Sequence, residues 1–431
     1  MKKAVVLGGY GFIGQACMRA LRAAGYEVTG VGRSRAAAAQ CTLDVSWVFA
    51  DIATATVDDW KQIFRGASVV VNASGVLQDG SKDSLSVIHD VAVGNMLDAL
   101  AGSDVRFIQI SAAGAGAGAA TEFFRSKARG DARVQRSEID WIVLRPVLVF
   151  GAQAYGGTAL LRAAAAMPMV EPVVFENAPM QAIHVDDLAA AVVTAASGAL
   201  GTQFVADLAE RDSRAFREVV RTVRAWLGYP EWRYAIPIPR GLVGLAGRVA
   251  DGLGWLGWRS ALRTTSLKSL ETGIVGNPGE WIERGGSPFP AFDDTLRAIP
   301  ATNQERVFAR AQLILPIMIA VLSIFWVLSG AIGLWAYDRA VAVLTGSGVS
   351  QALSGTVVSV GALIDIALGV AVLKRSWSRY AAVGMVLVSV AYLLGATLFA
   401  PGLWADPLGP LLKVLPSIVL ALTVAMLIEV R

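Results

Sequence analysis

Three glycines near the start of the chain are spaced so that they could hold a phosphate-bearing ligand. Gly8, Gly11 and Gly14 follow an apolar, strand-like run from Ala4 to Leu7 and precede a helical pattern from Ile13 to Ala24. This spacing lets the backbone turn tightly, approach a pyrophosphate closely and pack the following helix against its strand. The amide groups at the start of that helix would face the phosphates. The sequence therefore predicts a dinucleotide-binding loop.

The turn after the second predicted strand, Glu27 to Val31, favours a phosphorylated form of the dinucleotide. An NAD-specific site places an acidic side chain here, which binds the ribose 2′-hydroxyl. In this chain Arg33 and Arg35 stand there instead, on either side of Ser34. Because a guanidinium pairs well with a 2′-phosphate, we predict NADP(H) in preference to NAD(H). The alternative is a basic turn that is simply solvated.

Strand-like and helix-like segments alternate through the first half of the chain, and they are the elements that would position these residues. Further predicted strands are Val48 to Asp51, Ser68 to Asn72, Arg106 to Ser111 and Trp141 to Leu144. Such alternation is typical of a parallel sheet covered by helices. We therefore expect an α/β fold with a doubly wound parallel sheet.

The last 121 residues differ sharply in composition, since only ten of the 72 charged residues lie from Ala311 onward. Four apolar segments there reach the ~20 residues that a bilayer-spanning helix needs. Trp and Tyr near their ends are typical of membrane interfaces. We therefore predict an all-α four-helix transmembrane domain after a soluble module. Its predicted spans are Leu313 to Tyr337, Ala352 to Leu373, Tyr380 to Phe399 and Leu408 to Ile428.

Basic residues flank these spans unevenly, which predicts an orientation. Arg306 and Arg310 precede the first span, and Lys374, Arg375 and Arg379 fill one short loop. Because positively charged loops stay in the cytoplasm, we expect the N-terminal module and both chain ends to be cytoplasmic. The protein would be a multi-pass protein of the inner membrane. We expect no signal peptide before the first strand.

Two charged residues lie inside the predicted spans. Asp365 is in the second span, where a carboxylate is costly and is therefore a candidate functional group. Lys413 is in the fourth span, at a predicted depth about 12 Å from Asp365, and would reach outward to the interface. We expect Lys413 to be an anchor. Asp365 is expected to be either a protonated interior carboxyl or a contact for a polar ligand group.

Cysteine and histidine are too scarce to suggest a disulfide or a metal centre. Cys17 and Cys41 are expected to be core thiols in a reducing compartment. His89 and His184 are the two histidines of the chain, so a histidine-rich metal site has almost no ligands available. We predict no metal.

Motifs spread over residues 1 to 300 resemble the extended or atypical short-chain dehydrogenase/reductase (SDR) family. In chain order they are Asp51-Ile52, Asn72-Ala73-Ser74-Gly75, Ser111, Leu144-Arg145-Pro146, Phe150-Gly151 and His184-Val185-Asp186-Asp187-Leu188-Ala189. The resemblance implies a Rossmann domain with a small substrate lobe. It places Asp51 near the adenine, and Arg145 and Pro146 near the nicotinamide. The implied cofactor-binding residues are Gly8, Gly11, Phe12, Ile13, Gly14, Arg33, Ser34, Arg35, Asp51, Ile52, Ala73, Ser74, Gly75, Ser111, Lys127, Arg145 and Pro146.

The catalytic residues of that family are a serine, a tyrosine and a lysine, the last two spaced Y-x-x-x-K. Ser111 and Lys127 match the serine and the lysine, but the tyrosine position is Phe123. Phenylalanine has no hydroxyl, so ordinary carbonyl reduction loses its general acid. Tyr155 is an alternative hydroxyl, although nothing in the sequence places it at the nicotinamide.

The retained lysine and lost tyrosine are similar to the atypical SDR branch that includes the Rossmann-like accessory subunit of respiratory complex I. The apolar tail resembles the DoxX-like family. We therefore expect a membrane-anchored, NADP(H)-binding oxidoreductase of a lipid-soluble substrate such as a quinone or an isoprenoid. The alternative is a non-catalytic nucleotide-binding scaffold or redox sensor of a membrane complex. The expected partners are the bilayer and a hydrophobic small molecule or membrane complex, with no nucleic acid.

The expected domains are a Rossmann core at 1–155, a substrate lobe at 156–305 and a DoxX-like membrane domain at 306–431. Within the lobe, Gly241 to Leu262 carries an apolar stripe flanked by basic and indole side chains. It is either a core helix or a segment lying in the membrane interface. The stripe is Leu242, Leu245, Val249, Leu253 and Leu256, and its flanks are Arg240, Arg248, Trp255, Trp258 and Arg259.

Overall fold

The computed structural model describes residues 2–80, 83–258, 260, 262–407 and 409–428. Arg259 of the predicted interfacial segment and Leu408 at the predicted start of the fourth span lie outside the described residues. The chain forms two compact units. Unit 1 comprises Met1–Asp251 and Ser260–Ala309, and unit 2 comprises Gly252–Arg259 and Arg310–Arg431.

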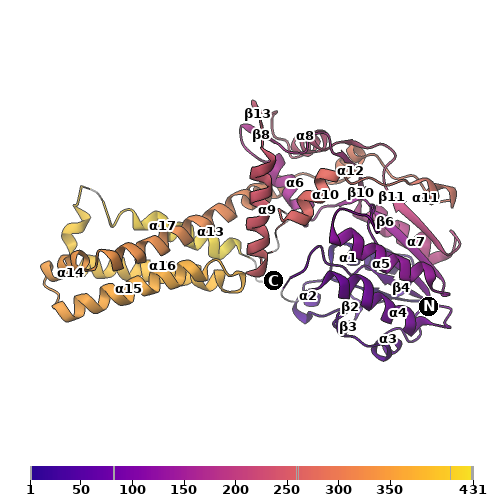
Figure 1. Ribbon diagram of the computed structural model, residues 1–431, viewed down its shortest axis with the longest axis horizontal. Helices are drawn as coiled ribbons and strands as arrows, with labels where there is room; N and C mark the ends of the chain where they lie inside the picture. Colours follow the sequence, from indigo (N-terminus) through magenta and orange to yellow (C-terminus); the bar gives the residue numbers. More distant parts are fainter. Residues whose placement is uncertain (1, 81–82, 259, 261, 408, 429–431) are drawn as a thin grey trace. The chain divides into compact units, whose positions relative to one another are not determined.

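Unit 1 is built on a seven-stranded sheet with the strand order β11-β6-β5-β4-β1-β2-β3 (Figure 1). All neighbouring strands pair in parallel. The predicted α/β, doubly wound parallel sheet is therefore confirmed, with β11 as an edge strand that the sequence analysis did not include. The strands are β1 (Lys3–Leu7), β2 (Glu27–Gly32), β3 (Ser46–Phe49), β4 (Val69–Asn72), β5 (Arg106–Ile110), β6 (Trp141–Pro146) and β11 (Phe204–Leu208).

Both faces of the sheet are buried, because alternate residues of each strand enter different cores. Ala4 and Val6 of β1 belong to the core shared with α1 and α7. Val5 and Leu7 belong to the core shared with α3, α4 and α5. This arrangement explains why the strands are continuous apolar runs. The helices are α1 (Phe12–Ala23), α7 (Val185–Ser197), α3 (Val57–Ile63), α4 (Ala92–Leu100) and α5 (Glu122–Arg136).

The strand order places a ligand crevice at the carboxyl end of β1. From β1 the chain continues to β2 and β3 on one side, and then to β4, β5 and β6 on the other. Connections that leave in opposite directions open a crevice at this switch point, where open α/β sheets bind their ligands. The loops after β1, β2, β4 and β5 and the end of β6 carry most of the predicted cofactor residues.

The remainder of unit 1 consists of short strand pairs and helices that form a second lobe. Glu171 links a strand of this lobe to a helix, because its two carboxylate oxygens accept four hydrogen bonds of 2.8 to 2.9 Å from Arg217 and Arg221. The hydrogen bonds from Arg217 are the main reason that the pKa of Glu171 falls to about 2. The elements are β7 (Leu148–Phe150), β8 (Val170–Val173), β9 (Pro179–Met180), β10 (Ala182–His184), β12 (Arg214–Ala215), β13 (Tyr234–Pro237), α6 (Gly157–Ala165), α8 (Phe216–Trp226), α10 (Thr264–Thr272), α11 (Gly279–Glu283) and α12 (Phe292–Ala298), with α2 (Arg35–Ala39) and the π-helical turn η1 (Val87–Val91) in the Rossmann part.

Helix α9 (Arg240–Trp255) exposes the larger part of its apolar stripe. Leu242, Leu245 and Val249 have exposed fractions of 58%, 57% and 55%. The buried side of the helix carries smaller groups, among them Val243 and Ala250. Only a narrow face of this helix is therefore packed as a core helix would be, and the leucine stripe is exposed.

The end of α9 and the few residues directly after it belong to unit 2, where they pack on the turn between two helices. The Trp258 indole donates a hydrogen bond to the Leu373 carbonyl. The Arg375 backbone N–H donates to the Leu256 carbonyl at 2.9 Å. The Arg375 guanidinium lies over the Trp258 ring, 5.4 Å from its centroid. This segment is therefore an integral part of unit 2.

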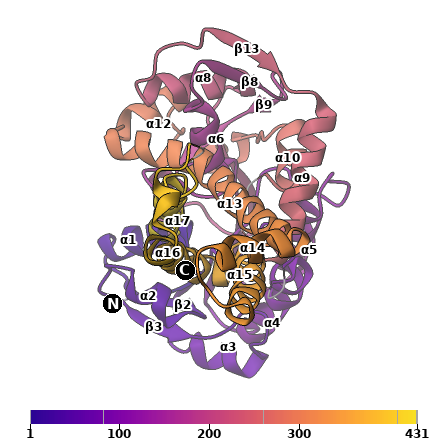
Figure 2. The same cartoon turned by 90° about the vertical axis from the view of Figure 1, so that its left-hand side faces the viewer.

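Unit 2 is an all-helical bundle, and Figure 2 looks along its helices. Among the described residues, three helices are long and apolar enough to cross a membrane: α13, α15 and α16. They match the first three predicted spans. The segment predicted as the first loop contains a further helix, α14. The elements are α13 (Asn303–Trp335), α14 (Tyr337–Gly346), α15 (Gln351–Ala371), α16 (Arg375–Phe399), the 3₁₀ turn η2 (Pro401–Trp404) and α17 (Val414–Leu427).

The fourth predicted span is wrong in its length. Its helix, α17, begins at Val414 and has 14 residues, so it extends only about 21 Å at ~1.5 Å per residue. Gly409 has a φ of +56°, outside the helical region, and Pro410 cannot donate a backbone hydrogen bond. Lys413 is the N-cap residue of this helix, so it lies at the helix end rather than within an apolar span.

Candidate functional site

The glycine loop between β1 and α1 is as tight as its spacing predicts. Gly8 has a φ of +71°, and its carbonyl accepts a 2.8 Å hydrogen bond from the Gly11 N–H. A Cβ atom on Gly14 would lie 2.2 Å from the Gly8 oxygen, and one on Gly8 would lie 3.0 Å from the Ala73 oxygen. Larger residues are therefore excluded, and the loop leaves its backbone open to a close-lying pyrophosphate.

Phe12 and Ile13 lie in the first turn of α1 and make different contacts. Ile13 packs against the core. Phe12 stacks on Tyr155, with ring centroids 6.0 Å apart and an angle of 15° between the planes. A Cβ atom on Gly151 would lie 2.9 Å from the Phe12 ring. Tyr155, the alternative hydroxyl of the sequence analysis, is thus positioned beside the glycine loop.

At the carboxyl end of β2, Arg33 already has an acidic partner. Its guanidinium forms an ion pair with Asp83 at 2.9 Å, and its backbone N–H donates to the Tyr10 hydroxyl at 3.2 Å. Asp83 comes from the segment after β4, on the other side of β1. The predicted 2′-phosphate ligand would therefore have to compete with this carboxylate for Arg33, or share the guanidinium with it.

The other predicted residues near the adenosine end are held mainly by local contacts. Ser34 is the N-cap of α2 and accepts a hydrogen bond from a backbone N–H in that helix. The Arg35 guanidinium lies over the Phe49 ring, 4.4 Å from its centroid. Asp51 accepts a 3.0 Å hydrogen bond from a backbone N–H two residues later, and Ile52 packs against the core.

The loop after β4 is shaped by side-chain hydrogen bonds and lies against Lys127. Asn72 donates to Gln109 at 2.9 Å and accepts hydrogen bonds from both the backbone and the hydroxyl of Ser74. A Cβ atom on Gly75 would lie 3.3 Å from Lys127 Nζ. The conformation of this loop therefore brings the glycine backbone directly over the lysine.

Lys127 is a buried ammonium group at this edge of the sheet. Its side chain comes from α5, only 4% of the residue is exposed, and Nζ donates to the Ile110 carbonyl at 3.0 Å. Burial lowers the pKa of Lys127 to about 8, while the nearby Asp131 carboxylate opposes the change. At neutral pH the lysine is therefore protonated, and it releases its proton far more readily than a solvated lysine does.

Ser111, Asp131 and Arg145 form a network beside Lys127. The Ser111 hydroxyl donates to Asp131 Oδ2 at 2.8 Å. The same oxygen accepts from Arg145 Nε at 2.9 Å and lies 2.7 Å from Nη2. Asp131 is fully buried, and Pro146, next to Arg145, is the last residue of β6. Asp131 was not predicted from the sequence, where its only signal is its place one helical turn after Lys127.

The ring at the tyrosine position packs against a neutral histidine. The Phe123 and His89 ring centroids lie 5.7 Å apart in an edge-on arrangement. His89 Nε2 accepts from the Val76 N–H at 3.1 Å, and Nδ1 lies 2.9 Å from Ser126 Oγ. Burial, followed by the Lys127 charge, lowers the pKa of His89 to about 2. His89 is therefore a fixed, uncharged support for the loop and for Phe123, and it cannot replace the missing acid.

These residues line one edge of the sheet in an order that suits an extended dinucleotide. Arg33 and Asp51 follow β2 and β3, and Gly8 follows β1. Ser111 and Arg145 lie at the ends of β5 and β6, with Lys127 and Asp131 brought in by α5. The glycine cradle and the buried ammonium fit a bound NAD(P). The set could bind the cofactor, orient a carbonyl oxygen and supply one proton.

Two protein families match separate parts of the chain. Residues 4–205 match the NAD dependent epimerase/dehydratase family, and residues 323–422 match the DoxX-like family. A similar curated protein is the ceramide reductase of Caulobacter vibrioides, which is 24% identical over 267 residues, or 62% of this chain and 81% of that protein.

Solved structures similar to this chain have the same fold in unit 1. WbmH of Bordetella bronchiseptica, solved in complex with NAD⁺, has a TM-score of 0.51 and 18% identity, and the match covers 69% of this chain and 97% of WbmH. UDP-glucose 4-epimerase of Thermotoga maritima, solved with UDP-glucose, has a TM-score of 0.51 and 14% identity, covering 72% and 99%. The resemblance to SDR proteins and to the DoxX-like family is confirmed. The chain joins an SDR-type domain of the NAD dependent epimerase/dehydratase family to a DoxX-like membrane domain.

Proposed function

We propose that the protein is a membrane-bound, NAD(P)H-dependent reductase that converts a ketone on a ceramide-type lipid to an alcohol. The observation that carries this proposal is the buried Lys127 ammonium beneath Gly75, with the Ser111 hydroxyl beside it on the Asp131 carboxylate. The similarity to a ceramide reductase supports both the reaction and the lipid class. The DoxX-like domain supports a substrate that resides in the membrane.

The proposed chemistry assigns the missing acid to the lysine. Reduced nicotinamide, when bound, supplies a hydride to the carbonyl carbon. Phe123 has no proton to give, so the carbonyl oxygen takes its proton from Lys127 Nζ, whose pKa of about 8 lies near the working pH. The Ser111 hydroxyl donates to Asp131 in this structure, so to orient the carbonyl oxygen it would turn and donate its proton to that oxygen instead. The products are the alcohol and oxidised cofactor, and Lys127 regains its proton from solvent.

Several classes of lipid-soluble carbonyl compound are candidate substrates. A quinone or an isoprenoid was the expectation from sequence, and both would suit an active site next to a bilayer. The named activity of the curated relative favours a ceramide-type lipid instead. We keep the quinone as the competing substrate in the test below.

NADP(H) is the proposed cofactor, and the supporting observation is the position of Arg33 and Arg35 after β2. The matched family is described as NAD dependent, so the preference depends on these two arginines. Because Arg33 forms an ion pair with Asp83, this pair determines how strongly Arg33 can bind a 2′-phosphate.

A second candidate function is a nucleotide-binding scaffold or redox sensor of a membrane complex. The packing of Phe123 against the neutral His89 favours it, since neither ring can donate a proton to a substrate. The two functions differ in one measurable respect. A scaffold binds NAD(P)H without oxidising it, whereas a reductase consumes it when a lipid ketone is present.

The test uses the purified full-length protein in phospholipid nanodiscs. NADPH and NADH oxidation are followed with a ceramide whose hydroxyl has been oxidised to a ketone, with a short-chain ubiquinone, and with no addition. We expect turnover with the lipid ketone, at least 100-fold slower in Lys127→Ala and unchanged in the control Lys61→Ala, an exposed surface lysine. Phe123→Tyr, which restores a phenol, should raise the rate.

Three results of this test would change the proposal. Oxidation with the quinone alone would replace the ceramide-type substrate. Turnover that survives in Lys127→Ala would remove Lys127 as the acid. Tight NADPH binding with no oxidation in any arm would leave the scaffold as the function.

We further propose that unit 1 is on the cytoplasmic side of the inner membrane, and that the short helix α17 makes a fourth crossing, so that both chain ends are cytoplasmic. Support comes from Lys374, Arg375 and Arg379, which cluster at the turn between α15 and α16. A reporter fused to the C-terminus should be cytoplasmic, and one inserted between Gly346 and Gln351 should be external. A cytoplasmic signal from the inserted reporter would reverse this orientation.

A further inference from the structure

A continuous stretch of the chain exposes bulky apolar side chains and arginines together. It begins at Arg233 and runs through β13 into α9, with Ile238 and Pro239 as the link between them (Figure 1). The Ile238 N–H donates to the Val173 carbonyl at 2.9 Å, and the Pro239 carbonyl accepts from the first turn of α9 at 2.9 Å. The link is therefore fixed. We call this stretch the α9 surface, and its exposed side chains are Arg233, Tyr234, Ile236, Arg240, Leu242, Leu245, Arg248, Val249 and Trp255.

The apolar side chains of α9 lie opposite the side of the helix that is packed. At 3.6 residues per turn, Leu245 and Val249 are within about 40° of each other around the helix axis. The buried Val243 and Ala250 lie about 100 to 160° away from them. The leucine stripe thus faces away from the body of unit 1, and the other side of the helix is the one that supports it.

Arginines flank this stripe, and their charges are largely left to solvent. Arg233 and Arg248 are exposed and have no carboxylate partner within the described part of the chain. Arg240 lies 3.7 Å from Glu271, but its side chain is 85% exposed, and such surface pairs are weak. Several arginines of α5 and α8, by contrast, bind carboxylates closely. The α9 surface therefore offers positive charge beside apolar side chains.

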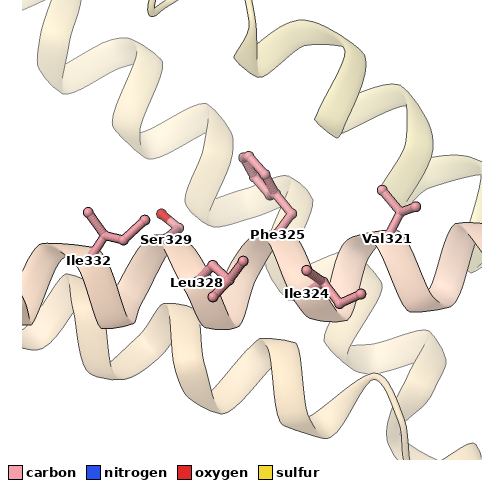
Figure 3. Close-up of a pocket in the computed structure, with 6 residues that line it drawn as sticks. All are labelled: Val321, Ile324, Phe325, Leu328, Ser329 and Ile332. Carbon is pink, nitrogen blue, oxygen red and sulfur yellow. The ribbon is translucent and has the colours of Figure 1, made fainter.

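The exposed side of α13 differs from the α9 surface in composition. Figure 3 shows six neighbouring side chains of α13, of which five are apolar and none is charged. The sixth is Ser329, whose hydroxyl donates to Asp365 inside the bundle. This composition suits a helix surrounded by hydrocarbon. A surface that combines leucine with arginine and tryptophan is instead typical of helices that lie in the headgroup layer of a bilayer.

The end of α9 belongs to the membrane domain. Trp255 is the last residue of α9 and is already part of unit 2. Shortly after it, the Trp258 indole donates to the Leu373 carbonyl, at the turn between α15 and α16. At the same turn the Lys374 ammonium lies over the Trp377 ring, 4.0 Å from its centroid. Because lysine and tryptophan at the ends of membrane-spanning helices are typical of the interface, α9 ends at headgroup depth.

We propose that the α9 surface lies in the headgroup layer and binds anionic phospholipids in preference to zwitterionic ones. The leucines would enter the boundary between headgroups and acyl chains, and Arg233, Arg240 and Arg248 would bind the phosphates. The quaternary ammonium of phosphatidylcholine offsets its phosphate charge and repels a guanidinium, whereas phosphatidylglycerol keeps a net negative charge. This proposal goes beyond the reductase function and does not depend on it.

The test measures which lipid surrounds Trp255 in the full-length protein. Nanodiscs contain equal amounts of phosphatidylglycerol and phosphatidylcholine, with bromine on the acyl chains of one lipid or of the other. Bromine quenches a nearby indole, and the Trp255 signal is the difference between the wild type and Trp255→Phe. We expect brominated phosphatidylglycerol to quench Trp255 roughly twofold more than brominated phosphatidylcholine does. In 1 M salt, where the Debye length is about 3 Å, the two should quench almost equally.

The decisive variant combines Arg233→Gln, Arg240→Gln and Arg248→Gln. It should lose the preference for phosphatidylglycerol and keep the total quenching, because the leucines remain in place. Retained quenching also shows that the variant is folded. The matched control removes three exposed arginines from other parts of unit 1 and should keep the preference. Its changes are Arg22→Gln, Arg284→Gln and Arg297→Gln.

Three outcomes would overturn the proposal. Equal quenching of wild-type Trp255 by the two brominated lipids would mean that the surface does not select anionic lipid. Quenching by neither lipid would mean that the surface is outside the bilayer. A preference that survives in the triple arginine variant would assign it to the basic turn at Lys374.

The reductase proposal fails separately from this one. Lys127→Ala should abolish turnover and leave the quenching by both brominated lipids intact. A wild-type protein that reduces no ketone but shows the phosphatidylglycerol preference would support the α9 surface while removing the reductase function.

Discussion

The Ser111 hydroxyl is held by Asp131, to whose Oδ2 it donates a 2.8 Å hydrogen bond. Asp131 is fully buried on α5, and the same oxygen is bonded to Arg145 at the end of β6. One carboxylate thus joins two strand ends and a helix, and it fixes the rotamer of the only hydroxyl that matches the catalytic serine. The position of Ser111 is therefore a property of the fold.

Replacing Asp131 should affect both stability and activity. Asp131→Asn leaves Arg145 without its buried carboxylate and should lower the free energy of unfolding by about 2 to 4 kcal/mol, since Arg145 keeps some solvent contact. Turnover should also fall, because Ser111 loses its fixed orientation. Ser111→Ala, which keeps the ion pair, should lower stability by only about 1 kcal/mol. Thermal unfolding followed by circular dichroism measures the stability of both variants. The control is Asp58→Asn, a change at an exposed residue.

The depressed pKa of Lys127 predicts how activity depends on pH. The folded-state pKa of about 8 lies below the ordinary value of 10.5, so the protonated form that donates is lost as pH rises through 8. We expect kcat for the lipid ketone to fall above that pH. The Lys127→Arg variant should still bind NADPH, and the activity that it retains should not fall above pH 8. A decline at the same pH in Lys127→Arg would assign it to another group.

The same shift has a consequence for stability. Because the unfolded chain holds this proton up to about pH 10.5 and the folded chain releases it near 8, folding releases a proton in that window. Stability should rise with pH between these values. Lys127→Met should remove that rise.

The sequence was sufficient to predict the residues that lie along the sheet edge. Gly8, Ser111 and Arg145 lie at or just beyond the ends of apolar strands, and the ends of parallel strands meet at one edge. The contacts among side chains were not predictable. Asp131 could have faced solvent on α5, and the packing of Phe123 on His89 joins segments 34 residues apart in the chain. Such pairs depend on tertiary distances that no local pattern contains.

The membrane domain was predicted from hydropathy, which averages over a window and is insensitive to backbone conformation. Hydropathy therefore identified the helices α13, α15 and α16. It also extended the fourth predicted span through Gly409 and Pro410, which precede the start of α17. It marked Asp365 as unusual but could not supply its partners. Ser329 and Tyr392 come from two other helices.

The ion pair between Arg33 and Asp83 predicts how cofactor preference can be tuned. Because Asp83 neutralises Arg33 at 2.9 Å, Asp83→Asn should free the guanidinium for a 2′-phosphate and tighten NADPH binding several-fold. NADH binding should hardly change. Arg33→Asp should narrow or reverse the preference. Isothermal titration calorimetry with both cofactors measures these affinities, with Arg22→Ala, an exposed arginine of α1, as control.

Equal affinity of the wild-type protein for NADPH and NADH would contradict the assignment of Arg33. So would an unchanged affinity ratio in Arg33→Asp. In either case the Arg33–Asp83 pair would be a structural link between the turns after β2 and β4.

The exposed stripe of α9 predicts a contact with the membrane surface. Leu242, Leu245 and Val249 are more than half exposed, and apolar stripes flanked by arginine and tryptophan bind the interface of a bilayer. We expect Leu242→Glu with Leu245→Glu to raise KM for the lipid ketone while leaving NADPH affinity intact. Brominated phospholipids should quench Trp255 in the wild type, identified by difference from Trp255→Phe, and quench it less in the double variant. Arg297→Glu, an exposed charge change on α12, is the matched control. Unchanged quenching and KM in the double variant would mean that the stripe does not touch lipid, and the route of the substrate would then have to avoid α9.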